Sequence, residues 1–312
     1  MKKFRANGKL LLTGEYFVLD GAKALALPTI PGQQMTFVEG LHPVDTFTWK
    51  SYSVDGTIWF EGVFSKKEYH IISCDDQATA QRLQEILVAV TGLNPGFNTQ
   101  IEQLTQVSTA LEFPRTWGLG TSSTLIAMIA KWAEINPYAL LEKTFGGSGY
   151  DLACASAIGP LLYELPGPVI KPVHFAPSFS DQLYFVYLNK KQNSREGIRQ
   201  YRSLPQKPTK EIREITELTQ AMLDCNTLND FKKIIIQHEA IVAKTLKLQK
   251  AKELYFKDYP GAIKSLGAWG GDFILATGDE SEDWVQHYFN QKKMSVFKPY
   301  RSIIKNDGLE MV

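Results

Sequence analysis

The sequence predicts a two-domain α+β protein. Its 312 residues are enough for two moderate domains, each with its own core. Short apolar runs typical of strands alternate along the chain with longer segments whose apolar residues repeat at helical spacing, so both kinds of element are expected. The composition changes around Pro166-Gly167-Pro168. We place the domain boundary there, which gives domains of residues 1–165 and 166–312.

The predicted elements of the first half are mainly strands. Pro28 ends one apolar run, and Val54-Asp55-Gly56-Thr57 is a typical hairpin turn. Strands are expected at residues 8–14, 24–27, 35–38, 47–54, 58–60 and 98–107. The period changes after Asp76, where Leu83, Ile86 and Leu87 share one helical face. Helices are expected at residues 76–90, from 121 to about 135, and at 137–144, with a small-residue segment at 152–158.

The second half mixes strands with amphipathic helices. Two strands are expected around the Pro-Gly-Pro turn, and a strand–glycine loop–strand unit is expected near the end of the chain. The predicted strands are residues 161–165, 169–175, 183–188, 263–266, 273–276 and 295–304. The predicted helices are residues 212–222, 231–242 and 284–289.

The overall composition excludes several classes of protein. Hydrophobic residues make up 44% and charged residues 21%, which is ordinary for a globular protein, and the net charge of +1 gives no reason to expect nucleic acid or a membrane surface as partner. Cys74, Cys154 and Cys225 are odd in number and far apart, so neither disulfides nor a zinc site are expected. The apolar run before Glu15 is too short for a signal peptide. We expect a cytoplasmic protein.

The segment from Trp117 to Ser123 has the features of an anion site. Gly118 and Gly120 let the backbone approach a ligand, and the hydroxyl residues after them can cap the helix that follows. The free N–H groups and the dipole at such a helix start favour a bound anion. No Gly-Lys-Ser/Thr follows, so this is not a Walker A loop. A helix that begins on a glycine turn without any ligand is the alternative.

Two other glycine-bearing segments occur in the chain, at residues 8–14 and 267–271. Each of them alone is compatible with an ordinary tight turn. In their order and spelling, however, Gly8-Lys-Leu-Leu-Leu-Thr-Gly-Glu-Tyr, Gly118-Leu-Gly-Thr-Ser-Ser and Gly267-Ala-Trp-Gly-Gly-Asp resemble the three motifs of the GHMP kinase superfamily, whose members phosphorylate small metabolites with ATP. The resemblance implies a mixed α/β N-terminal domain and a ferredoxin-like C-terminal domain.

Within that superfamily, Glu15-Tyr16 resembles the phosphomevalonate kinase branch, since mevalonate kinases usually have Glu-His. The residues from Ser148 to Ala153 and the Gly270-Gly271-Asp272 sequence favour the same branch. The chain also departs from the family pattern. Trp269 stands where a glycine is usual, and the stretch between the second motif and Asp151 is short. A tryptophan at that position is expected to stack on the nucleotide or to crowd it.

The resemblance also implies a set of site residues. Asp151 and Lys9 match the catalytic positions: Asp151 would orient or deprotonate the acceptor, and Lys9 would hold it ionised. The hydroxyl of Ser122, with Glu142 as the nearest carboxylate, would bind Mg²⁺. ATP would be bound by Gly118, Leu119, Gly120, Thr121, Ser122 and Ser123, and by Gly267, Gly270 and Gly271. Asp151 as a helix cap, and Lys9 and Glu142 as solvated residues, remain the alternatives.

The function expected from these motifs is an ATP- and Mg²⁺-dependent kinase of isoprenoid precursor synthesis, acting on phosphomevalonate or mevalonate. The partner is then a small anionic molecule, which a basic group of Lys190, Lys191, Arg195 and Arg199 could meet. A homodimer is left open. A homoserine kinase, a sugar kinase and a diphosphomevalonate decarboxylase relative are alternatives, and so is an inactive paralogue that binds a ligand or a partner protein.

Overall fold

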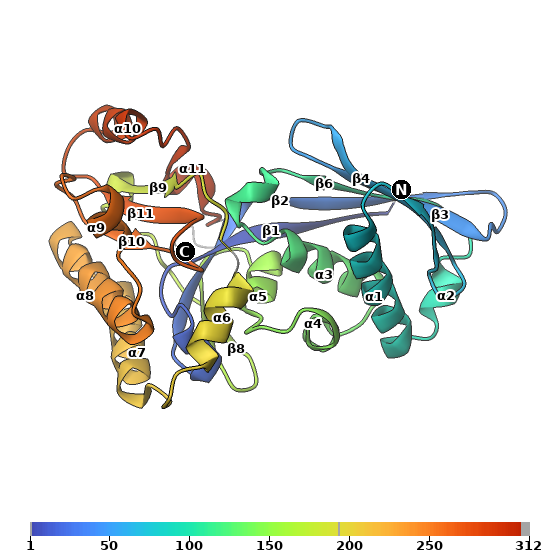
Figure 1. Cartoon of the computed structure of the whole chain (residues 1–312), viewed down its shortest axis with the longest axis horizontal. Helices are drawn as coiled ribbons and strands as arrows, with labels where there is room; N and C mark the ends of the chain where they lie inside the picture. The colour runs from blue at the N-terminus through green and yellow to red at the C-terminus, as the bar shows by residue number, and fades with distance from the viewer. Residues whose placement is uncertain (1, 193, 307–312) are drawn as a thin grey trace, which may run out of the picture. The chain divides into compact units, whose positions relative to one another are not determined.

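A computed structural model describes residues 2–192 and 194–306 (Figure 1). The contacts group the chain into two compact units, each built from discontinuous segments. Unit 1 consists of residues 1–8, 31–115 and 119–156, and unit 2 consists of residues 9–30, 116–118 and 157–312. The boundary expected at residue 165 stays a prediction; in this grouping it falls inside unit 2.

Unit 1 is built on a mixed sheet with the strand order β5–β4–β3–β6–β2. β3 and β6 are parallel, and the other neighbours in this order are antiparallel. The hairpin turn between β3 and β4 forms as predicted, with Gly56 at φ 82°. The strands are β1 (Lys3–Leu11), β2 (Ala24–Glu39), β3 (Thr46–Tyr52), β4 (Ile58–Ser65), β5 (Ile71–Cys74) and β6 (Leu104–Leu111).

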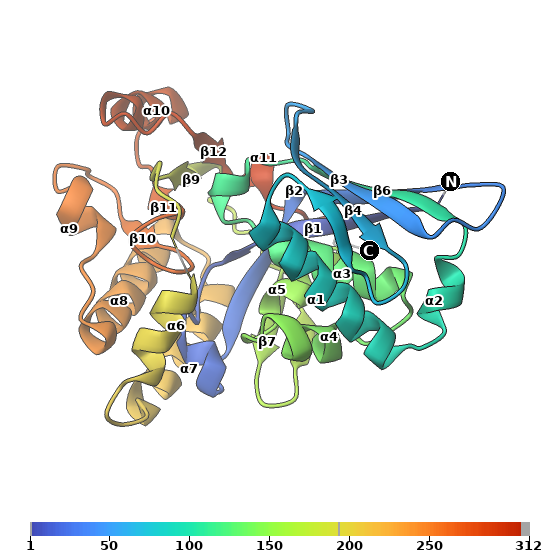
Figure 2. The ribbon, with the colours of Figure 1, turned by 45° about the vertical axis from the view of Figure 1, so that its right-hand side comes forward.

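Helices of unit 1 cover one face of this sheet (Figure 2). The side chain of Asp76 caps α1 by accepting from the amide of Thr79, and the predicted face of Leu83, Ile86 and Leu87 is buried in the core. The bounds of the helices are α1 (Gln77–Leu93), α2 (Phe97–Gln100), α3 (Thr121–Trp132), α4 (Pro137–Thr144) and α5 (Tyr150–Ser156).

The strand β2 corrects one prediction. Two short strands were expected because Pro28 lacks an N–H donor, yet residues 24–39 form one strand. Residues 24–26 pair with β7 (Leu161–Glu164), and residues 33–39 pair with β6. The prolines at 28 and 31 fall between these two ladders, where no hydrogen bond to either strand is lost. β7 pairs in turn with β8 (Val169–Pro172), as the Pro-Gly-Pro turn predicts.

Unit 2 contains a four-stranded antiparallel sheet with the order β10–β11–β9–β12. Its strands are β9 (Leu183–Tyr187), β10 (Ile263–Ser265), β11 (Phe273–Thr277) and β12 (Phe297–Pro299). Helices connect β9 to β10 and β11 to β12, so the chain follows the βαββαβ path. This strand order and connectivity are those of a ferredoxin-like fold, as the resemblance implies.

The three helices predicted for the second half of the chain all form, as α7, α8 and α10. α7 and α8 pack together, and α8 also packs against β10. The strand predicted at 295–304 is shorter than expected, because helix α11 begins directly after Pro299. α6 and α9 were not predicted. The helices are α6 (Ser194–Arg202), α7 (Thr209–Leu223), α8 (Leu228–Leu246), α9 (Ala251–Tyr255), α10 (Glu282–Gln291) and α11 (Tyr300–Ile303).

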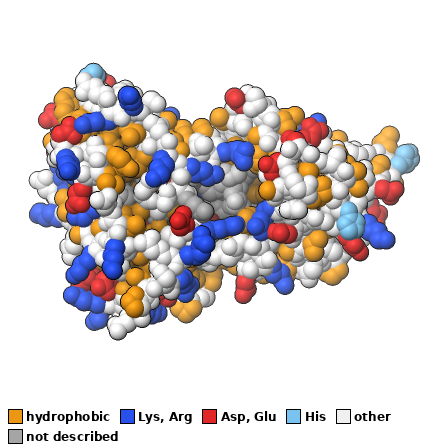
Figure 3. Space-filling model, viewed as in Figure 1, with side chains coloured by type: hydrophobic (Ala, Val, Ile, Leu, Met, Phe, Trp, Pro, Cys, Tyr) orange, Lys and Arg blue, Asp and Glu red, His pale blue; other side chains and the backbone are white. Residues whose placement is uncertain are grey.

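Acidic and basic side chains are interspersed on the surface seen in Figure 3, in keeping with the small net charge. Among the residues that the structure describes, no helix is both long enough and apolar enough to cross a bilayer.

Candidate functional site

The glycine loop before α3 forms an open helix start. Gly118 and Gly120 have φ values of 67° and 96°, in the left-handed region that favours glycine. Gly120 is the residue before the helix, and no side chain caps this end in the described part of the chain. The amides of the first turn therefore have no intrahelical acceptor and can meet an anion.

The hydroxyl residues after the loop do not cap the helix, contrary to expectation. The hydroxyl of Ser123 donates to the carbonyl of Gly120 at 2.9 Å, and the hydroxyl of Thr124 donates to Oε1 of Gln33 at 2.6 Å. A glycine occupies the capping position, so these buried hydroxyls satisfy acceptors inside unit 1 instead. Ser122, by contrast, is exposed at the helix start.

In unit 2, Lys9 lies at the entrance of the same loop. Its Nζ donates to the carbonyl of Gly118 at 2.8 Å. The half-buried carboxyl group of Asp272 contacts Gly118 so closely that a Cβ at residue 118 would lie 2.5 Å from its Cγ. Burial raises the pKa of Asp272, and the charges of Lys9 and Lys191 oppose that shift. An ammonium group and a carboxyl group therefore meet at the first glycine of the loop.

Asp272 is a residue for which the sequence predicted no role. The sequence feature that could have indicated a role is the position of Asp272 directly after Gly270-Gly271 in the third glycine segment. The amide of Gln192 donates to Oδ1 of Asp272 at 3.2 Å, and the amide of Asp272 donates to the carbonyl of Lys190. These bonds hold residues 190–192, including the two predicted substrate-binding lysines Lys190 and Lys191, next to the loop.

The third glycine segment connects β10 and β11. Gly267 and Gly270 have φ values of 59° and 76°, and a Cβ on Gly271 would lie 2.5 Å from the carbonyl oxygen of Lys190. All three predicted glycines of this segment lie in unit 2, as Lys9 and Gly118 do.

Trp269 has the left-handed φ of 55° that a glycine would adopt more easily. Its side chain is only 2% exposed and packs in a cluster with Tyr16, Phe17 and Tyr201. The buried ring has no open face on which a nucleotide base could stack, whereas the expectation that it crowds the nucleotide stays a prediction. Its bulk instead anchors the glycine segment in the core of unit 2.

Tyr16 provides a second link to this segment. Its hydroxyl donates to the carbonyl of Ala268 at 2.7 Å, and its backbone has a left-handed φ of 62°. The side chain of Tyr16 therefore joins the first motif to the third glycine segment. The sequence drew attention to this residue only because mevalonate kinases usually have a histidine in its place.

In unit 1, Asp151 and Glu142 lie on neighbouring helices. Asp151 is in the first turn of α5, and α5 packs against α3. Burial and the charge of Asp151 raise the pKa of Tyr138 to about 12, which places this carboxylate close to the Tyr138 ring hydroxyl. Glu142 is exposed on α4, which also packs against α3.

The donor groups are compatible with Mg²⁺ bound in the presence of phosphates. No group of three or more His, Cys, Asp or Glu residues suited to a metal occurs within residues 2–192 and 194–306. Mg²⁺ needs only one or two protein oxygens when phosphates and water complete its shell. The exposed hydroxyl of Ser122 and the exposed carboxylate of Glu142 are oxygen donors of the required kind.

Comparisons with known proteins give the fold. No protein-family model matches the sequence, and no curated protein matches it. Among solved structures, phosphomevalonate kinase of Streptococcus pneumoniae, in complex with phosphomevalonate and AMPPNP, is similar with a TM-score of 0.65 and 16% identity, covering 96% of this chain and 99% of that one.

Two further structures are similar over most of their length. Mevalonate kinase of L. major, in complex with R-mevalonate, has a TM-score of 0.62 and 14% identity, with coverage of 95% and 94% of the two chains. Galactokinase of Lactococcus lactis, in complex with galactose, has a TM-score of 0.63 and 12% identity, with coverage of 98% and 94%. The chain therefore has the fold of the GHMP kinases, as its three motifs predict.

Proposed function

We propose that this protein is an ATP-dependent kinase that transfers the γ-phosphoryl group to a small acceptor, with phosphomevalonate or mevalonate as the acceptor. The observation that carries the proposal is the open start of α3 behind two left-handed glycines, with Lys9 bound to the first of them. That combination supplies amide donors and a positive charge for phosphates. It occurs on a fold shared with solved kinases of small metabolites.

In this proposal the chain mainly positions the reactants and neutralises charge. The amides of residues 119–122 bind the phosphates, and Lys9 compensates their charge. Ser122 and Glu142 hold Mg²⁺, which supplies further neutralisation of the transferred group. Asp151 orients the acceptor oxygen and, where that oxygen is a hydroxyl, accepts its proton. Gly267, Gly270 and Gly271 let the third segment approach the nucleotide.

An anionic acceptor fits the charges of unit 2. Lys190 and Lys191 are exposed, and Lys191 lies close enough to Asp272 for its charge to oppose the rise that burial causes in the pKa of Asp272. Arg195 and Arg199 on α6 continue the basic segment. A homoserine kinase, a sugar kinase and a decarboxylase relative remain the alternatives among enzymes. An inactive paralogue is the alternative of another class, although the presence of Lys9, Ser122 and Asp151 argues against it.

The test is an ATP-consumption assay over mevalonate, phosphomevalonate, diphosphomevalonate, homoserine and several sugars. We expect turnover with mevalonate or phosphomevalonate and no release of CO₂. CO₂ release from diphosphomevalonate would identify a decarboxylase instead. Absence of turnover with every compound, together with absence of MgATP binding, would favour the inactive paralogue.

A further inference from the structure

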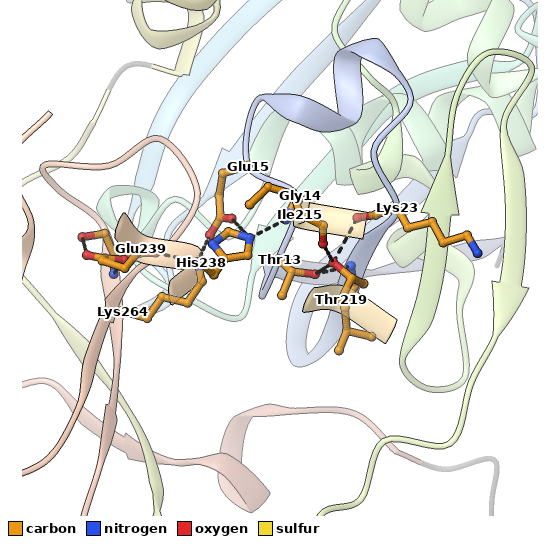
Figure 4. A network of polar contacts seen from close by, with 11 residues as sticks. Thr13, Gly14, Glu15, Lys23, Ile215, Thr219, His238, Glu239 and Lys264 are labelled. Carbon is orange, nitrogen blue, oxygen red and sulfur yellow. Dashed lines mark hydrogen bonds and ion pairs between the residues drawn. The ribbon is translucent and has the colours of Figure 1, made fainter. Parts of the chain in front are cut away.

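A buried polar cluster in unit 2 connects the first and the third glycine segments (Figure 4). We call it the two-loop cluster and define it by Glu15, His238, Glu239, Lys264 and Ser265. The side chains of Glu15, His238 and Lys264 are completely buried, and Glu239 and Ser265 are 2% exposed. Five polar residues, three of them ordinarily charged, are therefore enclosed in the interior.

Two adjacent residues of α8 each hold one of the two segments. Nε2 of His238 accepts from the amide of Gly14 in the first segment at 3.2 Å. The carboxyl group of Glu239 accepts from the amide and from the hydroxyl of Ser265, at 2.9 Å and 2.8 Å, where β10 leads into the third segment. One turn of one helix thus bonds both segments.

The residues that flank the two segments are also bonded directly to each other. Nζ of Lys264 donates to Oε1 of Glu15, and it donates to the carbonyl of Ser265 at 3.1 Å. Nε2 of His238 also lies 3.4 Å from Oε2 of Glu15. A displacement of either segment therefore breaks contacts made by the other.

Stability alone is a weak explanation for such a cluster. Removing charges from water is costly, and well-packed apolar residues commonly replace a buried ion pair without loss of stability. Among the described residues, Nδ1 of His238 and Oε2 of Glu15 have no hydrogen-bond partner. A neutral imidazole whose Nε2 accepts from Gly14 carries its proton on Nδ1, so that donor is buried and unsatisfied.

The geometry of the candidate site gives the cluster another role. Glu15 follows β1, the strand that carries Lys9, and Lys264 and Ser265 precede the segment that ends at Asp272. Lys9 and Asp272 meet at Gly118, so their separation depends on how the first and third segments lie relative to each other.

We propose that His238 and Glu239 are positioning residues that hold the first and third glycine segments in register, and through them Lys9 and Asp272 at the phosphate loop. The catalytic consequence rests on the proposed kinase function. The coupling between the two segments does not, and it can be measured without any activity.

Hydrogen–deuterium exchange of the whole chain tests the coupling. His238→Ala removes the acceptor of Gly14, and Glu239→Ala removes the acceptor of Ser265. We expect each variant to increase exchange at both places, in residues 13–17 and in residues 264–272, although each replaced side chain bonds only one backbone amide there. Tyr300→Phe is the control, because it removes a buried hydrogen bond of unit 2, to the carbonyl of Phe175, outside the cluster. Exchange that increases only next to the replaced side chain would overturn the proposal.

Glu239→Gln keeps the test interpretable if an alanine variant does not fold. Its amide can accept from Ser265 N and donate to Ser265 Oγ, so we expect exchange close to that of the wild type in both segments. If exchange increases as much in Glu239→Gln as in Glu239→Ala, hydrogen bonding to Ser265 does not hold the segments. That result would count against the proposal.

Steady-state kinetics test the catalytic consequence with the acceptor found in the screen. A misplacement of about 1 Å can cost about 10²-fold in rate, so we expect kcat of His238→Ala and Glu239→Ala to fall by about that factor well below their melting temperatures. The KM for MgATP should change much less, Glu239→Gln should recover most of the rate, and Tyr300→Phe should match the wild type. Unchanged kcat in both alanine variants would overturn the positioning role. If no acceptor reacts, the proposed function fails while the exchange experiment still decides the coupling.

Discussion

Gly118 is subject to two constraints at once, one on its backbone conformation and one on the space beside it. Its φ of 67° is strained for any other residue, and Asp272 occupies the space where a side chain would begin. Conformation alone would explain a glycine here. The contact with Asp272 adds a reason that the sequence could not reveal, because 154 positions separate the two residues in the numbering, which is 272 minus 118.

We predict that Gly118→Ala loses more than conformational strain explains. The matched control is Gly56→Ala, since Gly56 also has a positive φ but has no atom within 4 Å of a Cβ. The control should lose about 1–2 kcal/mol from backbone strain. Gly118→Ala should lose more and should bind MgATP poorly, because Asp272 has to move. Thermal unfolding and nucleotide titration measure both effects, and equal losses in the two variants would contradict the assigned contact.

A second prediction at this scale separates chemistry from binding at Asp151. Asparagine keeps the size of the side chain but cannot accept a proton, so Asp151→Asn should bind MgATP almost normally while turnover falls. The fall should be about 10²–10⁴-fold for a hydroxyl acceptor and smaller for a phosphate oxygen, which needs no strong base. Asp283→Asn, at an exposed acidic position in the first turn of α10, is the control. Turnover of Asp151→Asn close to that of the wild type would remove the catalytic assignment.

Helix α8 is the element whose importance the sequence hides. Its apolar periodicity correctly predicts a helix, with Phe231, Ile235 and Val242 buried. His238 lies on the same buried face, and nothing in the local sequence indicates that it and Glu239 bond two distant segments. Such contacts depend on the tertiary fold, so periodicity can predict the helix without predicting its polar partners.

We predict that Glu239→Gln alters the pH dependence of stability. Burial raises the pKa of Glu239 from 4.5 to about 7, against the opposing effect of Lys264. The folded state therefore binds this proton more tightly than the unfolded state, and the residue's contribution to stability decreases as the pH rises from about 4.5 to about 7. Glutamine does not ionise, so this decrease is absent in the variant.

The melting temperature of Glu239→Gln, minus that of the wild type, should accordingly increase between pH 5 and pH 8. The corresponding change in the free energy of unfolding between pH 5 and pH 8 is on the order of 2–3 kcal/mol, most of the roughly 3.5 kcal/mol that a shift of about 2.5 pKa units represents. Because Lys264 and Glu15 interact electrostatically with Glu239, the difference reports the ionisation of Glu239 within this cluster. A difference that is constant or decreases with pH would show that Glu239 is not held protonated in the folded state.

For the whole molecule, the sequence predicted the fold and most types of element more accurately than the residues at which the elements begin and end. Trp269 was expected to stack on the nucleotide or to crowd it. Its ring packs in the core instead, because it is covered by residues of α6, α7 and α8 that no local sequence pattern brings together. β2 was split into two strands for a similar reason. The sequence correctly shows that a proline has no N–H to donate. It does not show whether a neighbouring strand lies where that N–H would have been needed.

MgATP binding is the prediction that concerns the whole chain. A ligand that binds only the folded protein stabilises it by about 2.7 kcal/mol at one hundred times its Kd, and each kcal/mol raises the melting temperature of a domain of this size by about 2–4 °C. We expect a rise with millimolar MgATP that is much smaller after chelation of Mg²⁺ and in Gly118→Ala. No rise at several millimolar nucleotide would exclude the kinase proposal.

The discontinuous units have a consequence for the order in which the chain matures during synthesis. Every segment of unit 1 lies within residues 1–156, so its contacts can all form while the ribosome is still adding the second half. Unit 2 has to wait. Gly14 precedes His238 by 224 residues, and Glu15 precedes Lys264 by 249. The carboxyl group of Glu15, which is completely enclosed in the folded chain, is therefore translated long before its partner Lys264, so burying it is costly until α8 and β10 emerge.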